Sequence, residues 1–298
     1  MPTLDEITYS REATIAAVRD YYQFLTNMFL PEDFVHEPPA EGWPTVSKER
    51  VAELGKNDEV FELMRRLPYV AKETQLLGHA SVAYWPKLLT DHVWLGGVTP
   101  FNSEKVRIIT EGLDWEDVPS SAFGLICGGR NSETFILDTK FGTVHWLEAP
   151  DFDENPIRKP ITEPPGGSDP FEDCTPENEH GWRKPAWSIP DFFEVLKNEL
   201  RTLKHVPVKP HQIDWWFDEY ETKQDLDKFD SLIVAVRHAY QEHGWPDLSV
   251  YNKDKCQDAI SRLNEESSQR WQKQHDEMLK QRWKHLETPN TEQNTGDR

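Results

Sequence analysis

Residues 134–148 form the segment whose pattern allows the fewest structures. Two runs rich in apolar, aromatic and β-branched residues, Thr134–Asp138 and Thr143–Glu148, flank the four residues Thr139-Lys140-Phe141-Gly142. Such runs are typical of β-strands, and a four-residue connection that ends in glycine suits a turn whose last residue has a positive φ. The sequence therefore predicts an antiparallel hairpin in which Asp138 faces Thr143.

This register sorts the hairpin side chains onto two faces, because successive residues of a strand point in opposite directions. One face carries only large apolar groups, namely Phe135, Leu137, Val144 and Trp146. The other face is mixed and carries Thr134, Ile136, Asp138, Thr143, His145 and Leu147. We expect the first face to be core, and the mixed face to decide whether the hairpin supports chemistry.

Helices are predicted on both sides of this region. Apolar residues recur every three or four positions in segments 10–30, 188–203 and 226–243, which is typical of amphipathic helices. Ser47 and Asn57 are favourable N-cap residues and predict two short helices, and Ser188 with Pro190 marks another helix start. Short aromatic or β-branched runs predict further strands at the following places: 82–85, 92–95, 106–109 and 123–127.

Together these elements predict an α+β fold with a mainly antiparallel sheet flanked by helices. We expect one domain over residues 10–250, followed by a long C-terminal helix at 252–287 and a disordered tail at 288–298. Prolines and acidic residues alternate near 151–185. Such a composition buries too little apolar surface to offset its ordering entropy, so a disordered acidic insertion is expected there.

Charge and cysteine usage narrow the class of protein. The 298 residues contain 33 Lys and Arg against 53 Asp and Glu, a formal charge of −20. A surface of that sign repels phosphate backbones, so neither nucleic acid nor an anionic membrane is an expected partner. No run of 18 apolar residues and no secretory signal is found, and Cys127, Cys174 and Cys256 are widely spaced. The expected location is the cytoplasm or the nucleus.

One catalytic arrangement is conceivable on the mixed face of the hairpin. Asp138 and His145 lie diagonally across the predicted strands, and Cys127 ends a neighbouring strand beside two glycines. A carboxylate that orients an imidazole beside a thiol is the arrangement of a nucleophilic enzyme. The alternative is that Cys127 is a small core residue, as cysteines in strands commonly are. This alternative is preferred, so no catalytic residue is assigned.

Metal and nucleotide sites are not predicted. Imidazole and carboxylate groups gather at His211, Asp214, Asp218 and Glu219, but without an established ligand spacing. In so acidic a chain such clusters arise from composition alone. Glycine-rich phosphate loops are also missing, so no cofactor is expected.

Aromatic residues among charged ones suggest a binding surface instead. Trp215, Trp216 and Trp271 occur in polar surroundings, where exposed indoles favour protein recognition. The alternative is that these indoles pack the C-terminal helices onto the body. If they are exposed, the surrounding carboxylates would steer a basic partner towards them.

The run Asp138–Trp146, followed by the helix start at Ser188–Leu196, resembles the SUKH superfamily, which includes fungal cell-wall-assembly regulators and bacterial toxin-immunity proteins. The chain is also similar to uncharacterised filamentous-fungal proteins, notably at Tyr21–Leu25 and Leu67–Val70. The superfamily resemblance covers about residues 12–206 and implies an antiparallel sheet flanked by helices. It also implies action through protein partners instead of catalysis, and it assigns no binding residue.

The sequence thus favours a non-enzymatic protein-binding module, regulatory or scaffolding, with an acidic and aromatic-rich surface. Two alternatives remain open at this point. One is a small-molecule enzyme that uses Cys127, His145 and Asp138. The other is a structural subunit that oligomerises through the C-terminal helix.

Overall fold

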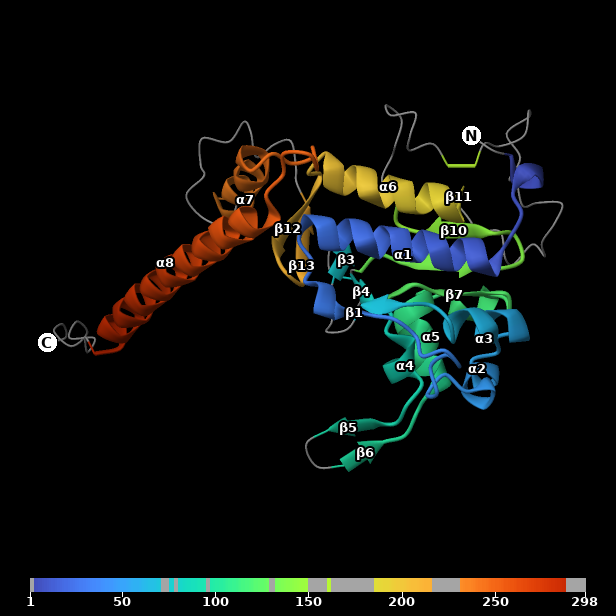
Figure 1. Ribbon diagram of the computed structural model, residues 1–298. Helices are drawn as coiled ribbons and strands as arrows, with labels where there is room; N and C mark the ends of the chain where they lie inside the picture. The colour runs from blue at the N-terminus through green and yellow to red at the C-terminus, as the bar shows by residue number, and fades with distance from the viewer. Residues whose placement is uncertain are drawn as a thin grey trace, which may run out of the picture.

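The computed structural model describes residues 3–70, 75–77, 80–94, 97–128, 132–149, 160–161, 185–215 and 231–287. Most of the predicted acidic insertion and the whole predicted tail lie outside these residues. The fold is α+β, as predicted, with small antiparallel sheets, flanking helices and a long C-terminal helix (Figure 1). Within the described part of the chain, no helix is long and apolar enough to cross a membrane.

The central sheet has four antiparallel strands in the order β11-β10-β9-β7. Its strands are β7 (Ala122–Gly124), β9 (Phe135–Asp138), β10 (Thr143–Trp146) and β11 (Ala186–Ser188). The smaller sheets are built from β1 (Val35–His36) with β2 (Tyr69–Val70), β3 (Gln75–Leu77) with β4 (Ala80–Val82) and β8 (Ile126–Cys127), β5 (His92–Trp94) with β6 (Gly97–Thr99), and β12 (His205–Lys209) with β13 (Gln212–Trp215).

The predicted hairpin and its register are confirmed. Asp138 pairs with Thr143, and the ladder continues to the pair formed by Phe135 and Trp146. Gly142 closes the turn with φ +69°, a conformation that glycine adopts without steric penalty. The predicted core face is fully buried, with 0% exposure at Phe135, Leu137, Val144 and Trp146.

The helices are α1 (Arg11–Met28), α2 (Lys48–Glu53), α3 (Asp58–Met64), α4 (Trp85–Leu88), α5 (Ser103–Glu111), α6 (Ile189–Arg201), α7 (Ser231–Glu242) and α8 (Lys253–Glu287). The predicted caps are confirmed, because the side chains of Ser47, Asn57 and Ser188 each accept a hydrogen bond from a backbone N–H three residues later. These caps satisfy amides that have no partner inside the helix.

Helices α1 and α6 lie side by side over the core face of the central sheet (Figure 1). Aromatic rings fill the layer between these helices and the sheet. Phe135 of β9 lies 5.0 Å from Phe192 of α6 and 5.2 Å from Trp146 of β10, centroid to centroid, with the rings edge-on. Edge-to-face packing of this kind adds to the stabilisation that burial alone provides.

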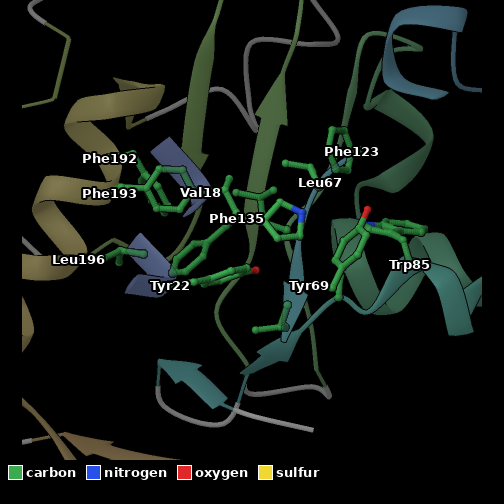
Figure 2. Close-up of a pocket in the computed structure, with 14 residues that line it drawn as sticks. Val18, Tyr22, Leu67, Tyr69, Trp85, Phe123, Phe135, Phe192, Phe193 and Leu196 are labelled. Atoms are coloured by element: carbon green, nitrogen blue, oxygen red, sulfur yellow. The ribbon is translucent and has the colours of Figure 1, made fainter. Parts of the chain in front are cut away.

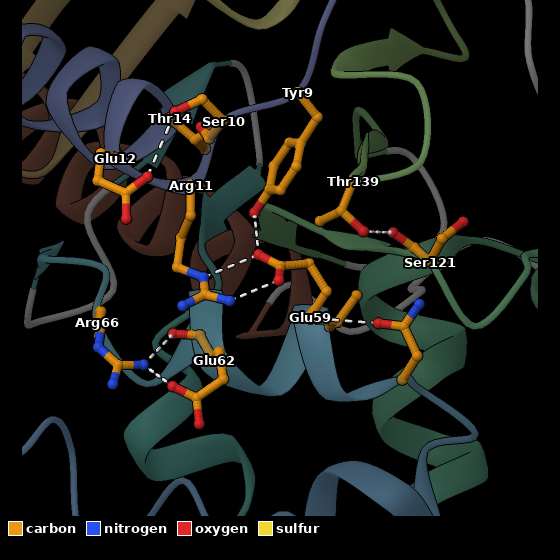
Figure 3. Close-up of polar contacts among 12 residues, drawn as sticks. Tyr9, Ser10, Arg11, Glu12, Thr14, Glu59, Glu62, Arg66, Ser121 and Thr139 are labelled. Atoms are coloured by element: carbon orange, nitrogen blue, oxygen red, sulfur yellow. Dashed lines mark hydrogen bonds and ion pairs between the residues drawn. The ribbon is translucent and has the colours of Figure 1, made fainter.

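The N-terminal segment ties α1 to α3. Glu59 of α3 accepts two hydrogen bonds from the Arg11 guanidinium, at 2.8 and 2.5 Å, and one from the Tyr9 hydroxyl at 2.8 Å (Figure 3). The Arg11 hydrogen bonds are the main cause that lowers the pKa of Glu59. A bidentate pair that is partly shielded from water fixes orientation better than an exposed pair of single charges.

Three of the strand predictions need correction. Residues 106–109 belong to helix α5, because Asn102 caps the segment by accepting the Lys105 N–H at 2.8 Å. Strand β4 ends at Val82, and Trp85 begins α4 with Pro86 in the first turn, where proline is tolerated. The predicted strand 123–127 divides into β7 and β8, which pair in different sheets.

Candidate functional site

Helix α5 packs on the mixed face of the hairpin sheet. A Cβ atom built on Gly124 of β7 would lie 1.9 Å from the Thr110 carbonyl oxygen of α5. The helix backbone therefore packs directly on the strand, and only glycine permits this approach. Asp138 and His145, the two hairpin members of the candidate catalytic set, are both 0% exposed.

Each of these two side chains has polar neighbours at hydrogen-bonding distance. The Asp138 carboxylate accepts hydrogen bonds from the Ser121 hydroxyl at 2.9 Å and from the Lys140 N–H at 2.8 Å. The His145 Nε2 atom lies 2.9 Å from the Thr143 hydroxyl. Thr139 also donates to the Ser121 carbonyl (Figure 3). These contacts hold the turn and the strand ends together, which is a structural use of the polar groups.

Cys127 lies in a different sheet from this pair. It belongs to β8, where it pairs with Ser81, and its thiol lies 3.8 Å from the Val82 carbonyl oxygen. His145 faces Ile136, which in turn faces Gly124, and Cys127 follows Gly124 by three residues. The structure brings Asp138 and His145 onto one face of the central sheet, whereas Cys127 belongs to the sheet of β3, β4 and β8.

A buried ion cluster next to this face is not predicted from the sequence. Glu111 of α5 lies 2.7 Å from the Lys56 ammonium and accepts a hydrogen bond at 2.8 Å from Arg107 Nε. The side chains of Lys56 and Glu111 are both 0% exposed. Burial lowers the pKa of Lys56 to about 8, although Glu111 and, more weakly, Asp138 act in the opposite direction. The sequence feature that could have revealed this cluster is the i, i+4 spacing of Arg107 and Glu111. This spacing brings two side chains together only in a helix.

A second pair of carboxylates lies at the open end of the hairpin. Glu133 accepts a hydrogen bond from the Trp146 indole N–H, and Glu148 accepts from both the N–H and the hydroxyl of Thr134. Burial raises the pKa of Glu133 to about 7, the indole opposes this shift, and the nearby Glu148 adds to it. The donors that bind these two carboxyl groups in the described contacts are all neutral.

The apolar cavity beneath α1 and α6 is too small for a substrate. It lies among Tyr22, Tyr69, Trp85, Phe135 and Phe193 (Figure 2). Its volume is about 20 Å³. That is room for roughly one water molecule, and the lining offers few polar partners to hold one.

Helix α8 begins firmly on the body and then leaves it (Figure 1). Cys256 and Ile260 of its first turns are 0% and 2% exposed. Asn264 donates a hydrogen bond of 2.7 Å to the Val208 carbonyl oxygen of β12. Beyond Ser267 we name residues 268–287 the arm, because their helix projects past the packed elements.

The arm exposes large apolar side chains. Trp271 is 54% exposed and Met278 is 60% exposed, and Leu279 is 38% exposed. The Trp271 indole stacks on the His275 ring of the same helix, with centroids 5.0 Å apart and planes 13° from parallel. Of the three indoles expected to bind a partner, Trp271 is therefore the one whose exposure the structure describes.

The remaining candidate residues are partly outside the described chain. Trp215 ends β13, and Trp216 lies beyond the described residues. Of the cluster considered for a metal, His211 is exposed and Asp214 accepts a hydrogen bond from Gln212 at 3.0 Å. Asp218 and Glu219 lie outside the described ranges. Among the residues that are described, no group of three or more His, Cys, Asp or Glu side chains could hold a metal ion.

Comparison with known proteins adds no relative. No family model, no curated protein and no solved structure matches the chain. The resemblance to the SUKH superfamily therefore stays a prediction.

Proposed function

We propose that this protein is a non-enzymatic binding module, and that the arm of α8 is its recognition element. The single observation that carries the proposal is that α8 exposes two large apolar side chains beyond the body. Trp271 and Met278 of the arm lie on the same side of α8 as Ile260, which is buried where the helix meets the body. The polar Asn264 and Ser267 lie between, and nothing in the described chain covers the two arm residues.

Helical geometry places the apolar residues on one side of α8. At 100° per residue, Ile260, Trp271 and Met278 fall within about 20° of one another around the axis. Ile260 is 2% exposed, whereas Met278, five turns further along, is 60% exposed. An apolar side that served only to pack on the body would end there, and this one resumes on the arm.

Exposure of an indole is costly unless a partner covers it. Burying a large apolar side chain stabilises by about 1.5–3 kcal/mol, and tryptophan is enriched among residues that dominate binding energy. The resemblance to a superfamily whose members bind proteins agrees with this use of Trp271. We expect the module to act in the cytoplasm or nucleus, where its free thiols Cys127 and Cys256 would stay reduced.

Charge separates the arm from the rest of the chain. Residues 268–287 contain five Lys and Arg against three Asp and Glu, whereas the whole chain carries −20. A basic partner is still expected for the acidic body, but the arm itself carries a net positive charge.

Photo-cross-linking tests the proposal. A benzophenone side chain is placed at Gln274, beside the exposed face, and in a matched variant at Lys273, on the opposite face. The protein captured only from Gln274 is then purified and titrated with the intact chain and with Trp271→Ala. The proposal expects the Trp271→Ala chain to bind about thirtyfold more weakly, the effect of losing about 2 kcal/mol at a central indole. Equal capture from both faces, or equal affinity of the two chains, would refute it.

A further inference from the structure

We infer that the partner of the arm is a second copy of this chain, whose α8 packs antiparallel on it about a two-fold axis between Asp276 and Glu277. The inference rests on the proposed function, because it names the occupant of the same exposed face. The occupant is argued from the order of side chains along that face and from the charge of the body.

The exposed face carries two apolar and two basic side chains in a fixed order. From the body outwards these are Trp271, His275, Met278 and Arg282. All four project within about 60° of one another around the helix axis. A parallel pair of arms would set Arg282 against Arg282 of the second copy, and like charges in contact are unfavourable.

An antiparallel pair removes this conflict. When Trp271 is set opposite Arg282 of the second copy, His275 is set opposite Met278, because both pairs share one midpoint. The guanidinium then lies on the indole, and the thioether lies against the imidazole ring. Both contacts are favourable for these groups. The two-fold axis repeats each contact twice, so four cross-contacts form from one face.

The length of the arm fits this arrangement. Residues 268–287 extend about 30 Å at 1.5 Å per residue. With this midpoint, nearly the whole arm of one copy overlaps the arm of the other. The overlap ends where each α8 joins its own body. The acidic bodies of the two chains, each chain carrying −20 in total, then lie at opposite ends of the overlap. Their separation exceeds the screening length of about 8 Å, so their mutual repulsion is small. A parallel pair would bring the two acidic bodies side by side.

Sedimentation velocity of the full-length chain tests the inference. Intact chain should shift from monomer to dimer as its concentration rises to about 100 µM, as mass action requires. Trp271→Ala should raise the dimer dissociation constant by about thirtyfold or more, since each dimer loses two indoles. Arg282→Glu and Lys280→Glu change the charge equally, but only Arg282 lies on the face. The first should weaken the dimer about tenfold, and the second should leave it within about threefold.

Cysteine cross-linking then tests the direction of packing. Gln274→Cys mixed with Gln281→Cys should form a disulfide between different chains under mild oxidation. Gln281→Cys alone should not exceed the background of the intact chain, because its two copies lie about 13 Å apart along the axis. Efficient cross-linking of Gln281→Cys alone, or none between the mixed variants, would contradict antiparallel packing and overturn the inference.

The outcomes separate this inference from the proposed function. A chain that stays monomeric at every concentration overturns self-association. If Gln274 still captures another protein that requires Trp271, the binding module stands without it. If the chain is monomeric and capture does not depend on the face, both ideas fail together.

Discussion

Replacing Glu111 with glutamine removes the only carboxylate in contact with Lys56 among the contacts described. In the folded protein this carboxylate lies 2.7 Å from the Lys56 ammonium and 2.8 Å from Arg107 Nε. Both members of the first pair have 0% side-chain exposure, so water cannot replace the lost charge. Glu111→Gln keeps the size of the side chain, removes its charge and replaces one acceptor oxygen with an NH2 donor.

The expected loss can be worked out from two parts. Lys56 has a pKa of about 8 in the folded chain against 10.5 for a free lysine. At 1.36 kcal/mol per pKa unit, keeping Lys56 charged in the folded chain already costs about 3.4 kcal/mol relative to the unfolded chain. Releasing its proton at pH 7 would cost about 4.8 kcal/mol on the same scale. Losing Glu111 therefore adds at most about 1.4 kcal/mol through Lys56, because that side chain can then release its proton.

Arg107 supplies the second part. It loses a hydrogen bond between charged groups, which is worth about 1.5–3 kcal/mol. It keeps its 2.9 Å hydrogen bond to the Val118 carbonyl oxygen, and its side chain is 12% exposed. The free energy of unfolding of Glu111→Gln at pH 7 should therefore fall by about 3–4 kcal/mol. Urea denaturation followed by tryptophan fluorescence measures this fall.

The dependence on pH provides a sharper signature. Between the folded and unfolded pKa values of Lys56, the unfolded chain binds more protons, so stability rises with pH. For the intact chain this rise runs from about pH 8 to 10.5, and for Glu111→Gln it should begin lower. In a Lys56→Met background, Glu111→Gln should cost less by about 1 kcal/mol or more, since the coupled partner is gone. A loss below about 1 kcal/mol, or a difference that does not change with pH, would refute the reasoning.

Three further predictions concern the hairpin and the helix that follows it. Glu133→Gln should be more stable than the intact chain at pH 8, because a carboxyl whose folded pKa is raised to about 7 loses stability as pH rises from its unfolded value near 4.5. At pH 4 both side chains are neutral and this advantage should disappear; denaturation curves that differ equally at the two pH values would contradict this. Gly142→Ala should cost about 1–3 kcal/mol, because φ is +69° and the new Cβ would lie 3.0 Å from the Tyr9 nitrogen; thermal unfolding measures it, and an unchanged midpoint would contradict it. Ser188→Ala should cost about 1 kcal/mol through the lost cap of α6, which urea denaturation checks, whereas Ser188→Asp should retain most of the stability.

Local signals sufficed for the elements that sequence reasoning placed correctly. The hairpin register follows from alternation and from Gly142, and the helix starts follow from Ser47, Asn57 and Ser188. Each of these depends on neighbours within a few residues of the chain. The interactions that determine the hairpin register and these helix starts are made between residues close together in the sequence.

Local signals failed where distant residues decide the structure. Residues 106–109 are apolar enough for a strand, yet Asn102 and the packing of Thr110 on Gly124 make them helical. The ion cluster includes the pair of Lys56 and Glu111, which are far apart in the chain, so no spacing in the sequence predicts this pair. Cys127 and His145 are separated by the division of one predicted strand into two sheets. Pairing between distant strands cannot be read from either strand alone.

The proposed recognition arm is tested most directly by hydroxyl-radical footprinting in the cells that express the protein, compared with the purified chain at high dilution. The account predicts that Trp271 and Met278 react several-fold more slowly in cells, because a partner covers their face. Leu113 and Val250, which are 89% and 65% exposed on the body, should react equally in both samples. Equal reactivity of Trp271 and Met278 in the two samples would contradict the claim that the arm binds another protein surface.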